Sequence, residues 1–256
     1  MLTGIDHLAI AVPDLDVAVK ALRDAVGIEA GGGGVHPGAG TANRLAWFGD
    51  TYLELITVVD REVAAATFLG GPTIRVLDEE GAGFVTFVLA SDDLDAGVGR
   101  LRAAGSAMSD PFPGERQRSD GRIVRWRLAR AGEVGPELPP FLIEHDTSAA
   151  EWTQAERAAR AIERHPIGGP VRLSELELRV ADVDPVAAAY RRELGLDLER
   201  SAADGATAKA RIGRQLVVLR ARDVGTAARA TIRLTFPGAR LTSAEILGCR
   251  FEIAPG

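Results

Sequence analysis

The chain has 256 residues, of which 46% are hydrophobic and 26% charged, and its formal net charge is −6. This apolar content excludes a disordered chain, and the acidic balance excludes a broad nucleic-acid-binding face, which requires an excess of basic residues. The single cysteine, Cys249, excludes a disulfide within the chain, and the lack of a long apolar run predicts a cytoplasmic protein that does not enter a membrane.

The first predicted module begins close to the N-terminus. Residues 5–12 form an apolar run of strand length, and the aspartate-rich turn after them suits the start of an amphipathic helix that ends at Gly27. The glycine-rich stretch 28–39 lacks the Gly-Lys-Ser/Thr of a phosphate-binding loop, so we interpret it as a flexible connector with at most a poorly defined strand. Two further strands are predicted at 43–48 and 52–58.

The second predicted module repeats this order. Residues 84–90 form an apolar strand, and residues 94–104 form a helix that stops at a glycine. A polar loop is predicted over 110–121, followed by strands at 123–129 and 141–144. Apolar and charged residues alternate along 123–129, which indicates that one side of this strand faces water or a partner.

A third module is predicted after a helix at 151–163 and a turn-rich linker at 165–170. Its own helix is expected at 186–194. Strands of the third module, and of a truncated fourth module that lacks a helix, are predicted at residues 173–180, 207–212, 215–221, 231–236 and 249–253.

An acidic turn links the first strand to the helix in all three complete modules, which indicates a fold built from copies of one unit. The sequence therefore predicts an α+β fold in which repeated βαβββ modules form two cupped mixed sheets. Residues 1–148 are expected to form the first domain, and residues 149–170 a helical linker. The third module and the truncated fourth occupy 171–256.

Several motifs resemble the vicinal oxygen chelate superfamily, which contains glyoxalases, bleomycin-resistance proteins and extradiol dioxygenases. The run Asp6 to Leu15 is similar to the opening strand and turn of many members. The blocks His36 to Asn43 and Phe48 to Ile56, with Pro140 to Glu144, resemble the narrower set of glyoxalase-like domain proteins. The resemblance covers about residues 4–166 and implies that two modules pair around a binding site.

The resemblance implies a divalent metal site whose ligands come from the first and last strands of two paired modules. His7, Glu54 and Glu144 match ligand positions, whereas Thr86 stands where a strong ligand is usual. Such a set suits zinc, nickel, manganese or iron. Strand alternation places Glu144 and His145 on opposite faces, and the family pattern favours Glu144 as the one that points inward.

A metal-free interpretation stays open beside this one. His7 and Glu54 can pair directly as an acid–base couple, or His7 can be a hydrogen-bonded core residue. In the third module Glu175 occupies the position of His7 without a matching carboxylate on the last strand. The second cup is therefore expected to be structural or to form a dimerisation surface.

Other residues are candidates for substrate binding. We interpret the segment from His36 either as part of the cup mouth or as a flexible surface loop. The aromatic candidates can face the pocket or pack the core, and the arginine-rich run 116–130 can attract an anion or form a solvated strand face. The predicted binding residues are His36, Thr41, Asn43, Trp47, Tyr52, Thr86 and Trp126.

These features predict a monomer or homodimer that binds a small oxygen-rich organic molecule in the N-terminal cup. One hypothesis is a metal-assisted isomerase or lyase, in which a metal or the His7–carboxylate couple polarises a carbonyl and moves a proton. The alternative is a non-catalytic protein that sequesters a small molecule, as bleomycin-resistance proteins do. A third hypothesis is a scaffold in which both cups serve assembly.

Overall fold

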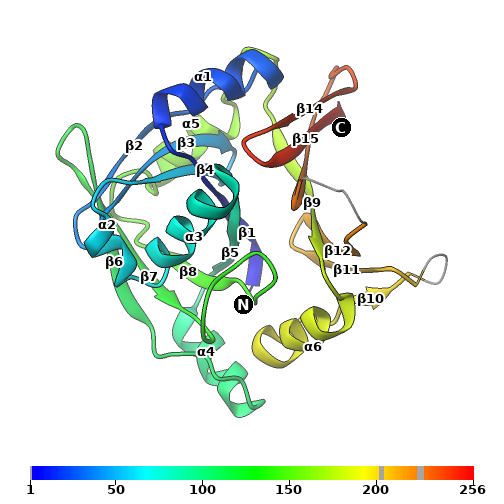
Figure 1. The fold of residues 1–256 in the computed structure, drawn as a ribbon. Coiled ribbons are helices and arrows are strands. Elements are labelled where there is room, and N and C mark those ends of the chain that lie inside the picture. The colour runs from blue at the N-terminus through cyan, green and yellow to red at the C-terminus, as the bar shows by residue number, and fades with distance from the viewer. Residues whose placement is uncertain (1, 202–204, 224–227) are drawn as a thin grey trace.

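A computed structural model describes residues 2–201, 205–223 and 228–256. The described residues form two sheets, a closed barrel of eight strands and a curled sheet of seven strands (Figure 1). The predicted α+β fold of repeated modules is confirmed, and the first cup closes into a complete barrel.

The barrel contains two βαβββ modules side by side. Helix α1 (Leu15–Val26) belongs to the first module and α4 (Leu94–Ala103) to the second. The strands, in their order around the barrel, are β1 (Leu2–Ala11), β4 (Thr51–Val58), β3 (Thr41–Phe48), β2 (Gly31–His36), β6 (Phe112–Arg118), β7 (Ile123–Ala129), β8 (Phe141–His145) and β5 (Gly83–Ser91).

The repeated acidic turn is the N-cap of each module's helix. The side chain of Asp14 accepts hydrogen bonds from the backbone amides of Asp16 and Val17 at the start of α1. Asp93 caps α4 in the same way, and Asp182 caps the helix of the third module. Each carboxylate satisfies amides that would otherwise lack a partner in the first turn, which is why the motif recurs.

The glycine run was wrongly interpreted as a flexible connector, because it forms strand β2. A Cβ atom on Gly33 would lie 2.2 Å from the carbonyl oxygen of Asn43, and one on Gly34 would lie 2.0 Å from that of Gln117. Gly33 also has a φ of +75°. These positions require glycine, since only a residue without a side chain lets β2 approach both β3 and β6 closely enough to close the barrel.

The polar loop predicted over 110–121 was also wrong, because residues 112–118 form β6. This strand pairs with β2 on one side and β7 on the other. Two helices between the modules were not predicted, α2 (Arg61–Ala65) and α3 (Gly70–Glu80). Helix α3 packs against β1, β4 and β5 of the barrel (Figure 1).

The second sheet holds the third module and the truncated fourth. Helix α6 (Val183–Leu194) belongs to the third. The strands in sheet order are β10 (Glu199–Arg200), β11 (Thr207–Ile212), β12 (Gln215–Ala221), β9 (Arg172–Val180), β13 (Ala230–Phe236), β15 (Cys249–Pro255) and β14 (Thr242–Ile246). In the described residues the fourth module therefore has three strands, one more than predicted.

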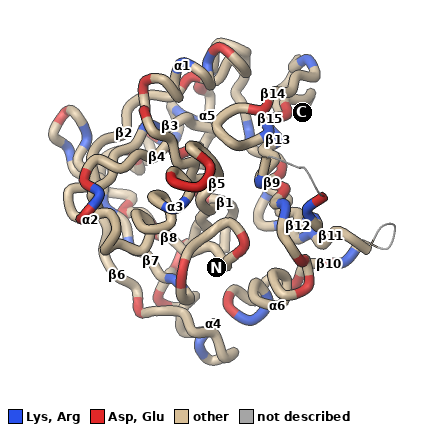
Figure 2. Tube along the Cα trace, viewed as in Figure 1, with Lys and Arg blue, Asp and Glu red and all other residues tan. Residues whose placement is uncertain are grey.

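Residues of both charges lie along the second sheet (Figure 2), and several of them form ion pairs. Arg233 binds Glu252 at 2.7 Å and also contacts Glu175, the residue at the position equivalent to His7. Arg220 lies 3.2 Å from the buried carboxylate of Glu177. The carboxylate equivalent to His7 is thus paired within the sheet, and the structural role of this half of the chain stays a prediction.

One apolar cluster draws on both sheets. Leu8 and Ile10 of β1 belong to it together with Leu176 of β9 and Phe251 of β15, all of them fully buried. Burial of this shared surface fixes the second sheet against the outside of the barrel.

The domain boundaries at 148 and 170 stay a prediction. Helix α5 (Gln154–Ala161) follows the barrel, and no helix of the described residues is long and apolar enough to span a membrane.

Candidate functional site

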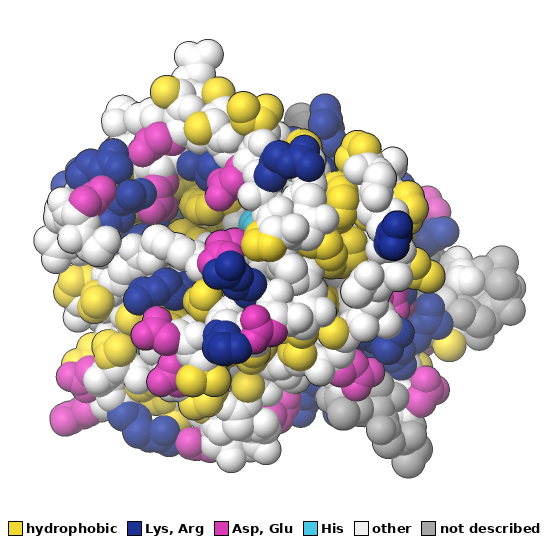
Figure 3. Space-filling view, turned by 90° about the horizontal axis from the view of Figure 1, so that it is seen from above, with side chains coloured by type: hydrophobic (Ala, Val, Ile, Leu, Met, Phe, Trp, Pro, Cys, Tyr) yellow, Lys and Arg dark blue, Asp and Glu magenta, His cyan; other side chains and the backbone are white. Residues whose placement is uncertain are grey.

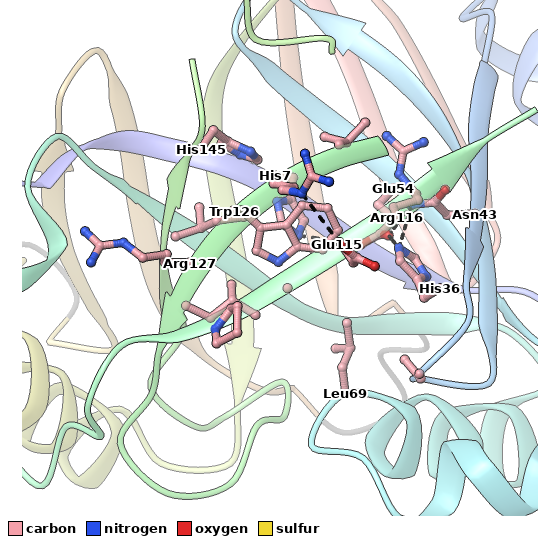
Figure 4. Close-up of a pocket in the computed structure, with 18 of the residues that line it drawn as sticks. His7, His36, Asn43, Glu54, Leu69, Glu115, Arg116, Trp126, Arg127 and His145 are labelled. Carbon is pink, nitrogen blue, oxygen red and sulfur yellow. Dashed lines mark hydrogen bonds and ion pairs between the residues drawn. The ribbon is translucent and has the colours of Figure 1, made fainter. Parts of the chain in front are cut away.

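The barrel encloses a cavity of about 910 Å³. A histidine side chain is visible inside a hollow on the face drawn in Figure 3, and Figure 4 shows residues of several strands converging on the pocket. Every predicted site residue except Trp47 and Thr86 lines the cavity. Its aromatic lining residues are Tyr52, Phe68, Phe112, Trp126, Phe141 and Trp152.

A β-bulge in β1 brings two consecutive side chains together. The pairing of β1 with β5 shifts between Ile5 and His7, so Asp6 is an extra residue in the ladder. Its carboxylate oxygen Oδ1 lies 2.6 Å from Nδ1 of His7. Sequence reasoning missed Asp6, since a regular strand would turn it away from its neighbour. The one feature of the sequence that could have indicated Asp6 is that it is a single acidic residue inside an apolar strand.

Asp6 is a buried anion. Burial by itself would raise the pKa of Asp6, but the electrostatic attraction and hydrogen bonds of the two rings that face it, His145 and His7, outweigh burial and hold the pKa well below its ordinary value. An ionised carboxylate can only accept hydrogen bonds. Asp6 therefore takes the hydrogen on Nδ1 of His7, and the second ring nitrogen, Nε2, faces the cavity side of the site.

The second nitrogen of His7 meets Glu54. Nε2 of His7 lies 3.5 Å from Oε2 of Glu54, and both side chains are buried. Asn43 donates from Nδ2 to the other carboxylate oxygen at 2.6 Å. The side-chain oxygen Oδ1 of Asn43 accepts from the backbone amide of Gly34 at 3.0 Å. A hydrogen on Nε2 of His7 would therefore face a carboxylate oxygen of Glu54.

Tyr52 lies against His7. The two rings stack with their centroids 4.6 Å apart at an interplanar angle of 18°. Burial raises the pKa of Tyr52 well above its ordinary value, and the nearby carboxylates of Asp6 and Glu54 raise it further. The phenol thus keeps its proton and is able to donate a hydrogen bond.

The segment from His36 lines the cavity, with its two ends in strands β2 and β3 and residues 37–40 as the turn between them. His36 ends β2 and its Nδ1 lies 3.0 Å from the hydroxyl of Thr41 in β3. Its Nε2 lies 4.0 Å from Glu54. Burial lowers the pKa of His36, and the positive charge of Arg116 lowers it further against the opposing effect of Glu54. A neutral His36 therefore borders the couple.

The lowered pKa of His36 makes the fold less stable in mild acid. Below the ordinary histidine pKa of about 6.5, the unfolded chain binds a proton at this residue that the folded chain resists, so stability falls as the pH drops. We expect His36→Gln to lose less stability than the wild type between about pH 7.5 and about pH 5 in urea unfolding. Identical pH dependence of the two proteins would contradict the assignment.

Glu144, which was predicted to be the inward residue of the pair, and His145 both line the cavity, but of the two it is His145 that contacts Asp6. Trp126 pairs with His145 and Arg127 with Glu144, so His145 shares the inner face with Trp126. Nε2 of His145 lies 3.0 Å from Asp6. The carboxylate of Glu144 instead accepts from the backbone amide of Leu94 at 3.1 Å and from Arg127 at 2.6 Å, at the start of α4.

The two predicted residues outside the cavity have packing contacts. The hydroxyl of Thr86 is buried and donates to the carbonyl of Phe87 at 3.2 Å. Trp47 lies behind Tyr52, with ring centroids 4.7 Å apart, and carries the guanidinium of Arg160 at 4.0 Å on its face. Both residues support the wall of the barrel.

The predicted three-ligand metal centre is not assembled. His7 and Glu54 come together, but Glu144 is bonded elsewhere and Thr86 donates to the backbone. Among the residues that the structure describes, no group of three or more His, Cys, Asp or Glu side chains is arranged to hold a metal ion. The donor set does not fit the metal that the resemblance implied, and no catalytic step is assigned to a metal.

A buried ion cluster borders the cavity. Arg116, which is 3% exposed, binds Oε2 of Glu151 at 2.5 Å, and Arg118 binds the other oxygen at 2.8 Å. Glu151 has a φ of +69°, and its backbone carbonyl accepts from Arg160. Interpreting the arginine-rich run as a solvated face was therefore wrong for Arg116. Sequence alone gave no sign of its partner, which is 35 residues away.

Comparisons with known proteins agree with this architecture. A family model described as a glyoxalase-like domain matches residues 5–194. The crystal structure of a hypothetical protein from Staphylococcus aureus aligns with 99% of each chain at a TM-score of 0.80 and 18% identity, which supports the fold over the whole length. No curated protein sequence matches the chain.

Methylmalonyl-CoA epimerases align with a smaller part. The enzyme from Mycobacterium tuberculosis covers 56% of this chain and 88% of its own at 24% identity and a TM-score of 0.41. The Streptomyces coelicolor enzyme, in complex with 2-nitronate-propionyl-CoA, covers 56% and 98% at 23% identity and a TM-score of 0.41. Similarity at this level carries no argument about the reaction or ligand of the present chain.

Proposed function

Because the chain belongs to the glyoxalase-like domain family, we propose that its barrel binds a small oxygen-rich organic molecule and catalyses proton transfer on it, as an isomerase or lyase. The observation that carries the proposal is the buried series Asp6, His7 and Glu54 beside a cavity of about 910 Å³, in which Asp6 is hydrogen-bonded to His7 and Nε2 of His7 lies at ion-pair distance from Glu54. A cavity of this size, with apolar walls and a few convergent polar groups, suits a small organic ligand.

The couple can act on a carbon–hydrogen bond next to a carbonyl group. Asp6 would stabilise an imidazolium at His7, and Asn43 bonds to the carboxylate of Glu54, so we place the proton that the couple shares on His7 and assign Glu54 as the base. Glu54 takes the carbon-bound proton, and the bonding electrons move onto the carbonyl oxygen as an enolate. The imidazolium of His7 and the phenol of Tyr52 are donors for that oxygen.

The enolate has two outcomes that balance. Return of the proton from Glu54 to another carbon gives an isomer. Expulsion of a leaving group from the neighbouring carbon gives a lyase product, with the proton available for the leaving group. Both outcomes need the same couple, and neither needs an added oxidant or reductant.

Proton transfer can be measured before the natural substrate is known. Wild-type protein in heavy water should incorporate deuterium next to the carbonyl of at least one compound in a panel of 2-oxo acids, 1,3-dicarbonyls and hydroxy ketones, followed by proton NMR. We expect His7→Gln and Glu54→Gln each to slow this exchange by about 10²–10⁴-fold, the usual contribution of general acid–base catalysis. Glu199→Gln, a matched change of an exposed carboxylate on the second sheet, should leave the rate unchanged.

The sequestering alternative predicts a different result. Saturable binding of a panel compound that is recovered without deuterium would contradict the catalytic proposal and support a non-catalytic binder. If His7→Gln changes neither the binding of the compound nor the rate of its deuterium exchange, the function lies outside the barrel.

A further inference from the structure

Asp6 is shared by two imidazoles that come from different modules. Its Oδ1 accepts from Nδ1 of His7 at 2.6 Å, and its Oδ2 lies 3.0 Å from Nε2 of His145. His7 belongs to β1 of the first module and His145 to β8 of the second (Figure 4). The carboxylate therefore joins the two halves of the barrel at the point where the acid–base couple begins.

His145 is held firmly by aromatic neighbours. Its ring stacks on Trp152 with centroids 3.6 Å apart and an interplanar angle of 13°, and Trp126 meets it edge-on at 6.4 Å. The side chain is 8% exposed. Contacts on the face and the edge leave the ring little freedom to rotate, so the direction of its Nε2 toward Asp6 is fixed by packing.

The unpaired nitrogen of His145 identifies its protonation state. Nδ1 is buried and has no hydrogen-bond partner among the described residues. A hydrogen on Nδ1 would be a buried donor without an acceptor, which favours the tautomer that carries its hydrogen on Nε2. Nε2 faces the anionic Asp6, which can only accept. His145 is therefore neutral, with its hydrogen on Nε2.

We propose that His145 is a positioning residue for His7, because its Nε2–H bond to Asp6 fixes the plane of that carboxylate and so keeps the hydrogen of His7 on Nδ1. Two donors on two different oxygens leave the carboxylate a single orientation, whereas a carboxylate with one donor can rotate about its terminal bond. The catalytic consequence rests on the proposed function of the His7–Glu54 couple, while the effect on His7 itself does not.

Wild-type protein tests the first step without any variant. Long-range proton–nitrogen correlation NMR should show His145 with a protonated Nε2 and an unprotonated Nδ1, and His7 with a protonated Nδ1 in a strong hydrogen bond. A hydrogen on Nδ1 of His145 would overturn the proposal, since the ring could not then be the neutral donor that the packing requires.

Two matched variants separate positioning from packing. His145→Phe keeps an aromatic ring against Trp152 but removes the donor, and His145→Gln supplies a side-chain amide donor without the ring. We expect the Nδ1–H signal of His7 to weaken and move upfield in His145→Phe and to return toward the wild-type position in His145→Gln. An unchanged His7 signal in His145→Phe would refute positioning, and so would equal effects of the two variants.

Exchange kinetics complete the test. With the best panel compound, His145→Phe should lower kcat by about 10–100-fold with little change in KM, the usual scale for a residue that orients a catalytic group, and His145→Gln should recover part of the loss. If the NMR signals respond as expected but wild-type protein exchanges no compound, the proposed function fails and the positioning of His7 stands. If exchange occurs and His145→Phe is as active as wild type, the positioning proposal fails alone.

Discussion

Asp6→Asn should slow the catalysed deuterium exchange by about 10³–10⁴-fold, on the scale seen when the carboxylate of a hydrogen-bonded catalytic histidine is replaced by its amide. Asp6 is buried and anionic, and it accepts the Nδ1 hydrogen of His7 at 2.6 Å. An amide carries no charge and can present an N–H to His7 in place of an acceptor. The hydrogen of His7 would then move to Nε2, and the imidazolium would lose its counter-charge.

The measurement is kcat for exchange of the best panel compound, with binding of that compound measured separately. Binding should persist, since Asp6 acts on His7 and not on the ligand. Asp24→Asn on the exposed face of α1 is the matched control and should retain full activity. An Asp6→Asn protein that stays within about tenfold of wild type would show that the tautomer of His7 is set in another way.

Glu151→Ala should destabilise the fold by about 3–5 kcal/mol, because it leaves the buried guanidinium of Arg116 without its anion. Arg116 and Arg118 bind the two oxygens of this carboxylate at 2.5 and 2.8 Å, and Glu151 is 6% exposed. Alanine at a φ of +69° keeps the strained backbone, so the measured loss reports the side chain and not relief of strain.

Urea unfolding measures this loss. Glu115→Ala is the comparison, since Glu115 is exposed, lies 3.8 Å from Arg125, and should cost under about 1 kcal/mol. Glu151→Gln, which keeps a hydrogen-bond acceptor without the charge, should fall between the two. Equal losses for Glu151→Ala and Glu115→Ala would mean that the buried cluster adds no net stability.

The sequence predicted those parts of the fold that have local signals. Asp14, Asp93 and Asp182 cap helices, and capping depends on residues a few positions apart, so the module repeat could be recognised. Strands β2 and β6 could not, because one is glycine-rich and the other highly charged. Strands β2 and β6 pair with each other and so close the barrel. This pairing joins segments that are far apart in the sequence.

The residues of the candidate site also divide into those that the sequence could predict and those that it could not. His7 and Glu54 were predicted from the resemblance and lie together, 3.5 Å apart. Asp6 was missed because a bulge, invisible in the sequence, changes the alternation of side chains along β1. Alternation also requires Glu144 and His145 to face opposite sides without saying which faces inward. The pairing of Trp126 with His145 decides that, and it depends on the register of β7 against β8.

The claim that His7 and Glu54 act as one couple is tested most directly by a double-variant cycle on exchange. The rate constants of wild type, His7→Gln, Glu54→Gln and the double variant are compared with one panel compound. Residues that act as a unit are not additive, so we predict that the double variant is no slower than the slower single variant. Losses that multiply in the double variant would mean that the two residues act independently, and would contradict the shared proton.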